Sequence, residues 1–375
     1  MHADDPMIVA FDVGPVRNRP AGVGLYATAM ANALAEALPS GALRLIGRRP
    51  DAAGLPEAVP SSPRSPRLPY RAWVQLRSAR DARLAGADIV HYADGLVPIV
   101  RHGRTVLAVH DMSVVRQWRT HPWRRYARIP FVLLSPRLAD LVIVPSRSTA
   151  DEVMRLCGVS ADRIKVIPYA PQRNIGPADE VTIAEVLPRY GLARGRYVLA
   201  LGTIEPRKNH LRLIAAFEAL ARRGEIDDDL VLAIAGQPGW GHEKVLAAVA
   251  ESPASGRIKV LGYAPGDDLP ALLTGAGAAV YVSLYEGFGL PVVEAMACGV
   301  PTVTSDCSSM PEVAGDAGFL VNPLDIADIA RGLTEALEAD TSDRAGARAR
   351  AIAQAATFSW ARTADRCAQL YRGLR

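Results

Sequence analysis

Two glutamates eight residues apart give the strongest chemical signal in the chain. Glu286 precedes a turn that contains Gly287 and Gly289, and Glu294 lies about one helical turn beyond Pro291. Glycine lets a backbone bend tightly and approach a ligand, and proline suits the first turn of a helix. The free amides at such a helix start bind anions, whereas nearby carboxylates would repel phosphate and accept hydrogen bonds from hydroxyls. The segment therefore predicts a site for a sugar that is attached to a phosphate.

A basic pair provides the second signal. Arg207 and Lys208 follow the bend at Pro206, after the first expected strand of the second half. At the carboxyl end of a strand such a pair can neutralise a diphosphate, arginine through paired hydrogen bonds and lysine as a point charge. Glu205 is expected to orient this pair rather than to act as a general base. Taken alone, the pair would be typical of a solvated surface, but Glu286 and its surroundings favour phosphate binding.

Both segments resemble those of a known family. The sequence EGFGLPVVEAMACGVP is similar to the donor-site element of the retaining glycosyltransferases of family 4, and GTIEPRKN is similar to a second element of that family. The resemblance implies the GT-B fold, in which two doubly wound Rossmann-like domains face a central cleft. It implies that Arg207 and Lys208 stabilise the leaving diphosphate. It places Glu286 at the donor sugar and Glu294 at the nucleotide ribose. The other donor-binding positions that we expect are Glu205, Tyr263, Phe288, Gly289 and Leu290.

A histidine and an aspartate follow the apolar run Thr105–Val109. A lone histidine is usually structural, but ligands of parallel sheets bind beyond the carboxyl ends of the strands. The resemblance implies that His110 hydrogen-bonds the donor sugar and helps to place its reacting carbon. Asp111 either shares that role or caps the next segment.

A glycine-rich segment before the first long expected helix supports a rival hypothesis. Gly22 and Gly24 begin a G-x-G-x-x-A pattern, and Arg48 with Arg49 would suit a 2′-phosphate, as in an NADP-dependent oxidoreductase or a nucleotide-sugar epimerase. However, a dinucleotide fingerprint turns directly from strand to helix, and the preceding strand is expected to end near Val13. The resemblance instead implies that the two glycines let donor diphosphate and acceptor come close.

Elements that would position these residues alternate between short apolar runs and longer helical patterns. Such alternation is typical of parallel sheets covered by helices on both faces, so both halves are expected to be α/β. The expected strands are Ile8–Val13, Leu43–Gly47, Ile89–Tyr92, Thr105–His110, Leu141–Pro145, Ile164–Ile167, Tyr197–Leu201, Leu230–Ala235, Ile258–Gly262, Ala278–Val282, Pro301–Thr304 and Gly318–Val321. The expected helices are Gly24–Leu38, Arg71–Ala85, Trp123–Ala139, Ser146–Cys157, His210–Arg223, Gly241–Val249, Asp267–Thr274, Pro291–Ala297 and Ile326–Ala339.

A segment rich in proline and glycine, Tyr169–Gly176, marks the expected domain boundary. We expect an acceptor-side domain at 1–172 and a donor domain at 173–355. The resemblance implies that a last helix, at 356–375, crosses back to the first domain. The loop Pro50–Pro69 is long for an ordinary connection, and it is either a surface loop or a lid over the acceptor site.

The charge of the chain is unevenly divided. Its 375 residues include 43 basic and 39 acidic ones, and 49% are hydrophobic, which excludes disordered and fibrous proteins. Residues 1–175 carry a net charge of +10 and residues 176–375 a net charge of −6. No apolar run is long enough to span a bilayer, and the four cysteines lack metal-ligand spacing. We expect no metal and no cofactor.

An acid-free stretch at 112–139 holds much of the positive charge of the first half. Arginines interleaved with aromatic residues suit an anionic lipid surface or a lipid-linked diphosphate acceptor, and a solvated basic face is the plainer alternative. No nucleic-acid-binding module accompanies the stretch, so no nucleic-acid partner is expected. We expect a cytoplasmic location and leave open a peripheral one on the inner face of the membrane. The expected acceptor or membrane residues are Arg116, Arg119, Arg124, Arg125 and Arg128.

Together these features predict a retaining glycosyltransferase. It would move a hexose from a nucleoside diphosphate sugar to a hydroxyl of a lipid-linked or polysaccharide-precursor glycan. By resemblance, the favoured donor is GDP-mannose, while a UDP-sugar or a deoxyhexose donor stays open. A non-catalytic sugar-nucleotide-binding protein is a further alternative, but the intact glutamate and basic pairs argue against it.

Overall fold

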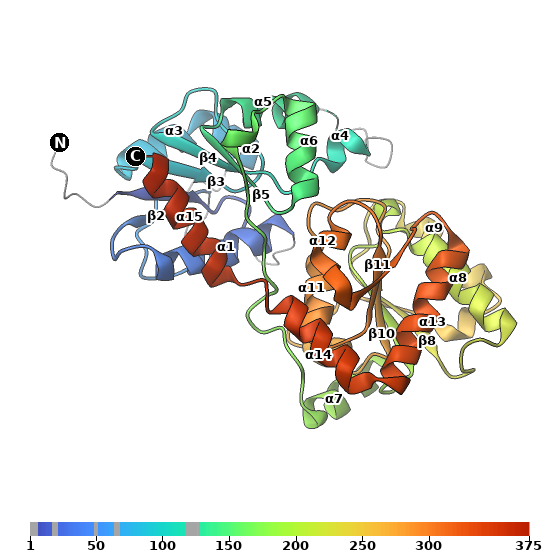
Figure 1. Cartoon of the computed structure of the whole chain (residues 1–375). Coiled ribbons are helices and arrows are strands. Elements are labelled where there is room, and N and C mark those ends of the chain that lie inside the picture. Colours follow the sequence, from blue (N-terminus) through green and yellow to red (C-terminus); the bar gives the residue numbers. More distant parts are fainter. Residues whose placement is uncertain are drawn as a thin grey trace. The chain divides into compact units, whose positions relative to one another are not determined.

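Two six-stranded parallel sheets form the framework of the protein (Figure 1). The computed structural model describes residues 7–16, 22–48, 52–63, 68–117, 126 and 128–374. The strands of the first sheet lie in the order β2-β1-β3-β4-β5-β6, and those of the second in the order β12-β11-β10-β7-β8-β9. In each sheet the chain starts in the interior and winds toward both edges, so the predicted α/β class with two doubly wound sheets is confirmed.

The first sheet is built from residues 9–166. Its strands are β1 (Val9–Asp12), β2 (Leu43–Ile46), β3 (Ile89–Tyr92), β4 (Arg104–Ala108), β5 (Leu141–Val144) and β6 (Ile164–Val166). The helices that accompany it are α1 (Val23–Ala37), α2 (Tyr70–Leu76), α3 (Ser78–Leu84), α4 (Ser113–Arg116), α5 (Ile129–Leu138), α6 (Arg147–Cys157) and the 3-10 helix η3 (Ala161–Arg163).

The second sheet is built from residues 197–321. Its strands are β7 (Tyr197–Leu201), β8 (Val231–Ala235), β9 (Ile258–Gly262), β10 (Ala278–Tyr281), β11 (Thr302–Ser305) and β12 (Gly318–Val321). Its α-helices are α7 (Glu180–Val186), α8 (His210–Arg223), α9 (His242–Glu251), α10 (Leu269–Thr274), α11 (Leu290–Ala297), α12 (Met310–Ala314), α13 (Ile326–Ser342) and α14 (Arg344–Ala355). Its 3-10 helices are η4 (Leu187–Tyr190), η5 (Pro206–Lys208), η6 (Ser255–Arg257) and η7 (Gly315–Ala317).

Both faces of the second sheet are buried. In β7, Val198 and Ala200 pack in one apolar cluster with Phe217 of α8, whereas Leu199 packs in another with Leu272 of α10. Successive side chains of a strand point to opposite faces, so this alternation shows a sheet covered on both sides. The continuous apolar sequence of the strand follows from that burial.

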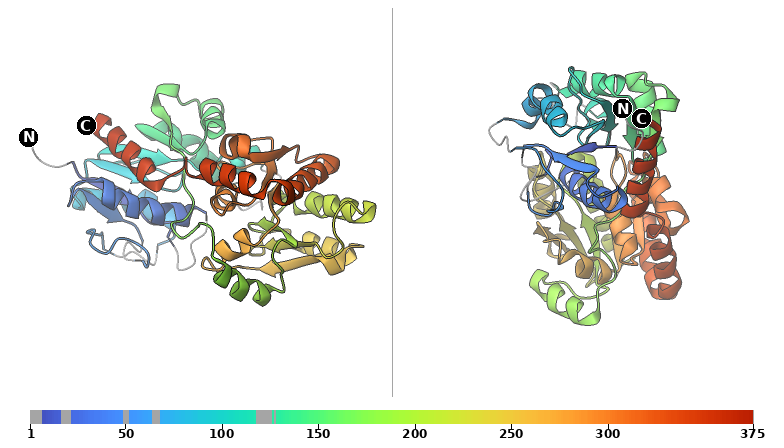
Figure 2. Two further views of the ribbon diagram at one scale, coloured as in Figure 1. Left: turned by 60° about the horizontal axis from the view of Figure 1, so that its bottom comes forward. Right: turned by 90° about the vertical axis from the view of Figure 1, so that its left-hand side faces the viewer.

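The chain divides into two compact units. The first contains the described residues of Met1–Trp118, Trp123–Tyr169 and Ser359–Arg375, and the described part of the second is Ala170–Phe358. The last helix, α15 (Trp360–Leu374), therefore belongs to the first unit, where it lies beside α1 (Figures 1 and 2). These units differ slightly from the expected ranges of 1–172, 173–355 and 356–375.

Some predicted helices need correction. The helix predicted at Arg71–Ala85 is wrong as a single element, because α2 and α3 are separated at Arg77, whose φ of −128° is not helical. At this break the Ser78 hydroxyl donates a hydrogen bond of 2.5 Å to the carbonyl of Val74, the local type of bond that competes with regular helix geometry. The described part of the helix predicted at Trp123–Ala139 begins at Ile129.

Four helices, α4, α7, α12 and α14, were not predicted from the sequence. Two of these carry a visible start signal, because Asp179 and Asp343 accept hydrogen bonds from the backbone N–H groups of Thr182 and Gly346. In the long loop at 50–69, Ser61 forms a parallel bridge with Leu45, so part of this loop extends the edge of the first sheet beyond β2.

Candidate active site

The loop after β7 carries the basic pair and is held by buried contacts. Arg207 and Lys208 lie in η5, and Asn209 follows in the left-handed conformation with φ of 63°. The buried Asn209 amide donates to the carbonyls of Val282 and Pro323, at 3.1 and 2.7 Å. These bonds fix the basic loop to the chain that follows β10 and β12. Both cations are therefore displayed at the carboxyl edge of the second sheet, as the sequence predicted.

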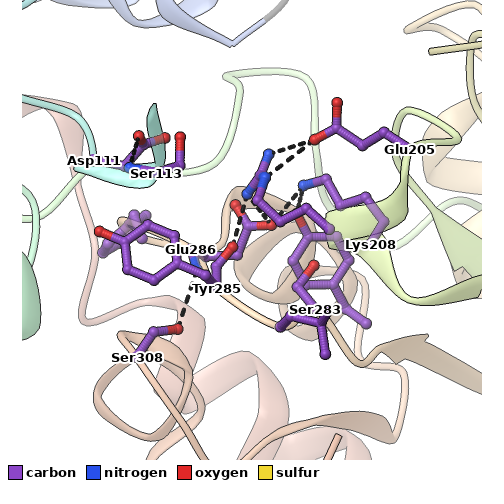
Figure 3. Close-up of polar contacts among 12 residues, drawn as sticks. Asp111, Ser113, Glu205, Lys208, Ser283, Tyr285, Glu286 and Ser308 are labelled. Atoms are coloured by element: carbon purple, nitrogen blue, oxygen red, sulfur yellow. Dashed lines mark hydrogen bonds and ion pairs between the residues drawn. The ribbon is translucent and has the colours of Figure 1, made fainter. Parts of the chain in front are cut away.

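One carboxylate oxygen accepts from both cations (Figure 3). Glu286 Oε1 lies 2.6 Å from Arg207 Nη1 and 2.7 Å from Lys208 Nζ. Arg207 also donates to Glu205 Oε1 at 2.8 Å and to the carbonyl of Tyr285 at 2.8 Å. Glu205 thus orients the arginine of the pair. The structure brings four predicted site residues into one network of two cations and two carboxylates.

Burial and charge set the protonation of this network. The exposed fraction of each of the side chains of Arg207, Lys208 and Glu286 is only 10–13%. Burial opposes ionisation of Glu286, but Arg207 and Lys208 outweigh it and lower its pKa to about 2. Burial lowers the pKa of Lys208, although Glu286 counteracts that shift. Lys208 also contacts the Tyr281 hydroxyl. The ion pairs keep Glu286 charged across the physiological range.

A serine-containing segment supports the glycine turn that follows Glu286. Ser308 Oγ accepts from the backbone N–H of Glu286 at 3.1 Å, and Ser309 Oγ donates to the carbonyl of Phe288 at 2.7 Å. The buried Ser309 side chain also contacts the carbonyl of Glu286. Sequence reasoning assigned no role to these serines. Their position directly after the expected strand at 301–304 is the signal that could have found them.

The predicted helix start is present at Leu290, the first residue of α11. Gly289 has φ of 113°, a backbone conformation that favours glycine, and a Cβ atom there would press on the end of the Met310 side chain. The N–H groups of Val292 and Val293 bond back to the Gly289 carbonyl. An anion at this end of α11 would therefore meet the amides nearest Gly289 and Leu290, as predicted from the sequence.

Glu294 lies in α11 and is 5% exposed. Burial raises its pKa to about 7. Gln172 Nε2 donates a hydrogen bond of 3.2 Å to Glu294 Oε1, and it belongs to the segment where the second unit begins. The sequence analysis missed Gln172 because 122 residues separate the two partners. The two glutamates therefore have opposite environments. Nearby cations lower the pKa of Glu286, whereas burial raises the pKa of Glu294.

Tyr263 lies beyond the end of β9 and is 52% exposed. The neighbouring strand ends approach closely, since a Cβ atom on Gly236 would lie 1.9 Å from the carbonyl oxygen of Gly202. Gly236 also donates its N–H to the carbonyl of Gly262 at 2.7 Å. Gly202, Gly236 and Gly262 thus let the loops after β7, β8 and β9 pack backbone against backbone. Tyr263 lies at the same edge of the sheet and is accessible there.

In the first unit, His110 lies beyond the end of β4. His110 Nε2 is 2.6 Å from the carbonyl oxygen of Ala93, and Nδ1 is 2.7 Å from the Tyr169 hydroxyl. Asp111 Oδ1 accepts the N–H of Ser113 at 2.8 Å, at the start of α4 (Figure 3). Asp111 thus accepts from a backbone N–H in the first turn of α4, although the N-cap residue of that helix is Met112.

The other glycine-rich segment lacks the geometry of a dinucleotide fingerprint. β1 ends at Asp12, and α1 begins at Val23, so the chain does not turn directly from strand to helix. Gly22 caps α1 with φ of 50°, and Gly24 is buried in its first turn. Residues 17–21, between strand and helix, lie outside the described part of the chain. This geometry removes the main support for the oxidoreductase hypothesis.

Two described arginines of the acid-free stretch have acidic partners from other elements. Arg116 Nε lies 2.8 Å from Glu152 Oε1, and Arg128 Nη2 lies 3.7 Å from Asp94 Oδ2. These ion pairs neutralise part of the positive charge of the stretch in the folded unit. Arg119, Arg124 and Arg125 lie outside the described residues.

The described residues contain neither a membrane-spanning helix nor a metal-binding cluster. No helix among them is both long and apolar enough to cross a bilayer. They also contain no group of three or more histidine, cysteine, aspartate or glutamate side chains arranged to hold a metal ion.

Comparison with known proteins identifies the family. Residues 20–170 match the family described as Glycosyltransferase Family 4, and residues 190–356 match Glycosyl transferases group 1. The O-antigen chain mannosyltransferase B of Escherichia coli is 37% identical over 274 residues, which cover 73% of this chain and 71% of that protein. This chain belongs to the family 4 glycosyltransferases. The predicted family is confirmed, and the reaction class is that of a retaining, metal-independent glycosyltransferase.

Two further proteins extend the comparison. The glycosyltransferase is 30% identical to the MMP alpha-(1->4)-mannosyltransferase of Mycolicibacterium hassiacum over 322 residues, or 79% of this chain and 73% of that protein. The crystal structure of Anabaena HepE with UDP and glucose matches 98% of this chain and 99% of that one, with a TM-score of 0.76 and 19% identity. The second match confirms the GT-B fold.

Proposed function

We propose that this glycosyltransferase moves mannose from GDP-mannose to a hydroxyl group of a polysaccharide precursor. The proposal is supported by the names of two relatives, an O-antigen chain mannosyltransferase and an MMP alpha-(1->4)-mannosyltransferase. The observation that carries it is the shared contact of Arg207 and Lys208 with Glu286 Oε1. This contact places two cations beside a carboxylate, the combination that a sugar diphosphate requires.

Donor binding would exchange partners within this network. The diphosphate brings negative charge to Arg207 and Lys208 and replaces the carboxylate as their main partner. Glu286 is then available to accept hydrogen bonds from hydroxyls of the hexose. The amides at the start of α11, near Gly289 and Leu290, add further donors for the phosphate oxygens. Phe288 lies in the same turn.

The remaining contacts with the nucleotide sugar are inferred from where each residue lies in the structure. Glu294, which is buried in α11, would accept from the ribose hydroxyls in exchange for Gln172. Tyr263 is exposed at the strand ends, where a nucleotide base can stack on it. In the first unit, His110 would hydrogen-bond the donor sugar through Nε2 in exchange for the Ala93 carbonyl. Gly22 and Gly24 would permit close approach of the donor diphosphate and acceptor.

Transfer would occur with retention on one face of the sugar. The bond between the anomeric carbon and the diphosphate oxygen breaks, the acceptor oxygen bonds to the same face of that carbon, and the departing diphosphate takes the acceptor proton. Arg207 and Lys208 stabilise the charge that develops on the diphosphate, and they are already fixed before the reaction. The two cations of this loop thereby stabilise the diphosphate charge that a metal ion stabilises in other transferases.

The acceptor would be a glycan carried on a lipid, handled by the first unit. Arg116, Arg119, Arg124, Arg125 and Arg128 would meet its anionic groups or the surface of an anionic membrane. Removing the charges of Arg124 and Arg125 should reduce sedimentation with vesicles that contain phosphatidylglycerol, and should not change sedimentation with neutral phosphatidylcholine vesicles. Equal sedimentation of wild type and variant with the anionic vesicles would reject the membrane role.

A donor panel tests the proposed reaction. The enzyme is incubated with a lipid-linked glycan acceptor and with GDP-mannose, UDP-glucose, UDP-GlcNAc or a deoxyhexose nucleotide, in a chelating buffer. Mannosyl transfer from GDP-mannose alone is the expected result. Transfer only from a UDP-sugar would overturn the mannose proposal while leaving the family intact. The UDP and glucose in the HepE crystals give a reason to include this arm.

A further inference from the structure

Two tyrosine side chains pack against His110 in the first unit, and a tryptophan packs behind them. Its ring centroid lies 4.8 Å from that of Tyr26 and 5.7 Å from that of Tyr169. Trp360, the first residue of α15, stacks on Tyr169 with an interplanar angle of 14° and a centroid separation of 6.1 Å. Tyr169 is the last residue before the chain enters the second unit, and Trp360 lies just after the chain returns. The aromatic group at His110 thus contains residues from both crossing points.

We propose that Tyr169 is a positioning residue that fixes the ring orientation of His110 for sugar transfer. The proposal rests on the proposed function, in which His110 contacts the donor sugar. It adds a role for a residue that is 59 positions away in the sequence and that no motif marks.

The hydrogen bonds of His110 determine the tautomer. A carbonyl oxygen can only accept, so the 2.6 Å contact with Ala93 requires a proton on Nε2 of His110. In the neutral imidazole, Nδ1 is then the acceptor, and the Tyr169 hydroxyl donates to it across 2.7 Å. Loss of the tyrosine hydroxyl would remove the only described hydrogen bond at Nδ1, while the Ala93 carbonyl would still require the proton on Nε2. The ring would then be held at one nitrogen only, and its orientation would no longer be fixed.

Tyr169 is itself held firmly enough to act as a fixed donor. Its side chain is buried, with rings of Tyr26 and Trp360 against it. The Thr363 hydroxyl of α15 donates to the carbonyl of Pro168, the preceding residue, at 2.8 Å. Burial raises the pKa of Tyr169 well above its ordinary value, so the hydroxyl keeps its proton at any working pH. A donor that is neither mobile nor ionised is what a fixed ring orientation requires.

A second histidine of the same unit provides a matched control. His91 Nδ1 lies 2.6 Å from the Tyr371 hydroxyl, which is the same kind of bond in the same unit. His91 is fully buried, and burial lowers its pKa to about 3. It has no place in the proposed site. Tyr371→Phe therefore removes an equivalent hydrogen bond from a histidine that only supports the fold.

The test compares Tyr169→Phe with Tyr371→Phe. Each variant keeps its ring, and the loss of one buried hydrogen bond should lower the stability of both to a similar small extent. Tyr169→Phe should lower kcat by about five- to tenfold while the KM for the donor stays within about twofold. Tyr371→Phe should leave both constants near those of the wild type. An unchanged kcat in Tyr169→Phe, or equal losses of kcat in both variants, would overturn the proposal.

Two further measurements separate positioning from general stability. The ¹⁵N shifts of the His110 ring should show a proton on Nε2 in both the wild type and Tyr169→Phe, and the Nδ1 signal of Tyr169→Phe should move downfield because that nitrogen has lost its hydrogen bond. In a double-mutant cycle, His110→Ala combined with Tyr169→Phe should be no slower than His110→Ala alone. Additive losses, or an unchanged ring signature, would reject the role of Tyr169. The ring signature needs no donor, so it remains decisive even if the donor proposal fails.

Discussion

Lys208 Nζ lies 2.7 Å from Glu286 Oε1, and the same oxygen lies 2.6 Å from Arg207 Nη1. A single carboxylate oxygen thus holds the two cations that are proposed to receive the donor diphosphate. In a buried setting, removing one partner of such a group leaves the others without compensation. The affinity of the site for an anion and the stability of the loop should therefore be linked through Glu286.

Glu286→Gln should separate binding from turnover. The amide cannot neutralise Arg207 and Lys208, so both cations gain from a bound diphosphate. We expect GDP to bind at least as tightly as to the wild type by calorimetry, whereas kcat falls about 100-fold or more. Glu251→Gln, in an exposed position at the end of α9, is the matched control. Loss of GDP binding in Glu286→Gln would contradict the proposed exchange of partners.

Lys208→Ala should impair catalysis far more than folding. The change removes one of the two charges that stabilise the leaving diphosphate, while Arg207 still compensates Glu286. We expect kcat/KM to fall at least 100-fold and the melting temperature to fall by only a few degrees. The comparison is with Lys244→Ala, an exposed lysine of α9. Parallel losses of activity and stability would instead indicate a structural lysine.

Glu294→Ala tests the ribose assignment. Without the carboxylate, the nucleotide loses a charged acceptor for its hydroxyls, which is worth about 1.5–3 kcal/mol. GDP should therefore bind about 10- to 100-fold more weakly in calorimetry, and binding of inorganic pyrophosphate should stay the same because it has no ribose. Unchanged GDP binding would eliminate this role for Glu294.

Asp12→Asn should change the pH dependence of stability. Asp12 is fully buried at the end of β1, and burial raises its pKa from the ordinary 3.8 to about 7, although the Tyr70 hydroxyl donates to it. A carboxyl group whose pKa is raised in the folded state stabilises that state below the unfolded pKa, and this contribution is lost as pH rises through the folded pKa. The loss should therefore occur between about pH 4 and pH 7.

The neutral amide introduced by Asp12→Asn avoids that loss. The variant should match the wild type near pH 4 and be more stable at pH 8, by on the order of 3 kcal/mol in urea unfolding. Asp151→Asn, at an exposed position of α6, should show no such divergence. A constant difference between Asp12→Asn and wild type across this range would show that Asp12 is ionised throughout.

The parts of the site that the sequence predicted are those whose signals are local. Arg207 and Lys208 stand next to Pro206, and Glu286 stands beside two glycines, so residue type and backbone constraint coincide within a few positions. Each segment also follows an apolar strand, and the carboxyl edge of a parallel sheet then places it with the others. The twelve strands were predictable for the same reason, because burial on both faces demands continuous apolar sequence.

The parts that were missed depend on partners distant in the sequence. Gln172 bonds to Glu294, and Tyr169 bonds to His110, and neither residue carries a pattern that names its partner. The ion pair of Arg116 with Glu152 likewise joins separate elements. Net charge along the sequence therefore overstated the free basic surface at 112–139. Helix α14, by contrast, could have been found from Asp343, a capping residue.

The position of α15 has a consequence for synthesis. This helix completes the first unit, but the 189 residues of Ala170–Phe358 are made before it. At about 5–20 residues/s, a ribosome takes roughly 10–40 s to add them. During that interval α1 has no α15 to cover it, and His91 has no Tyr371 to bond. The second unit, which is continuous in sequence, can finish folding first, so the nascent first unit is the stage at which a chaperone would be needed.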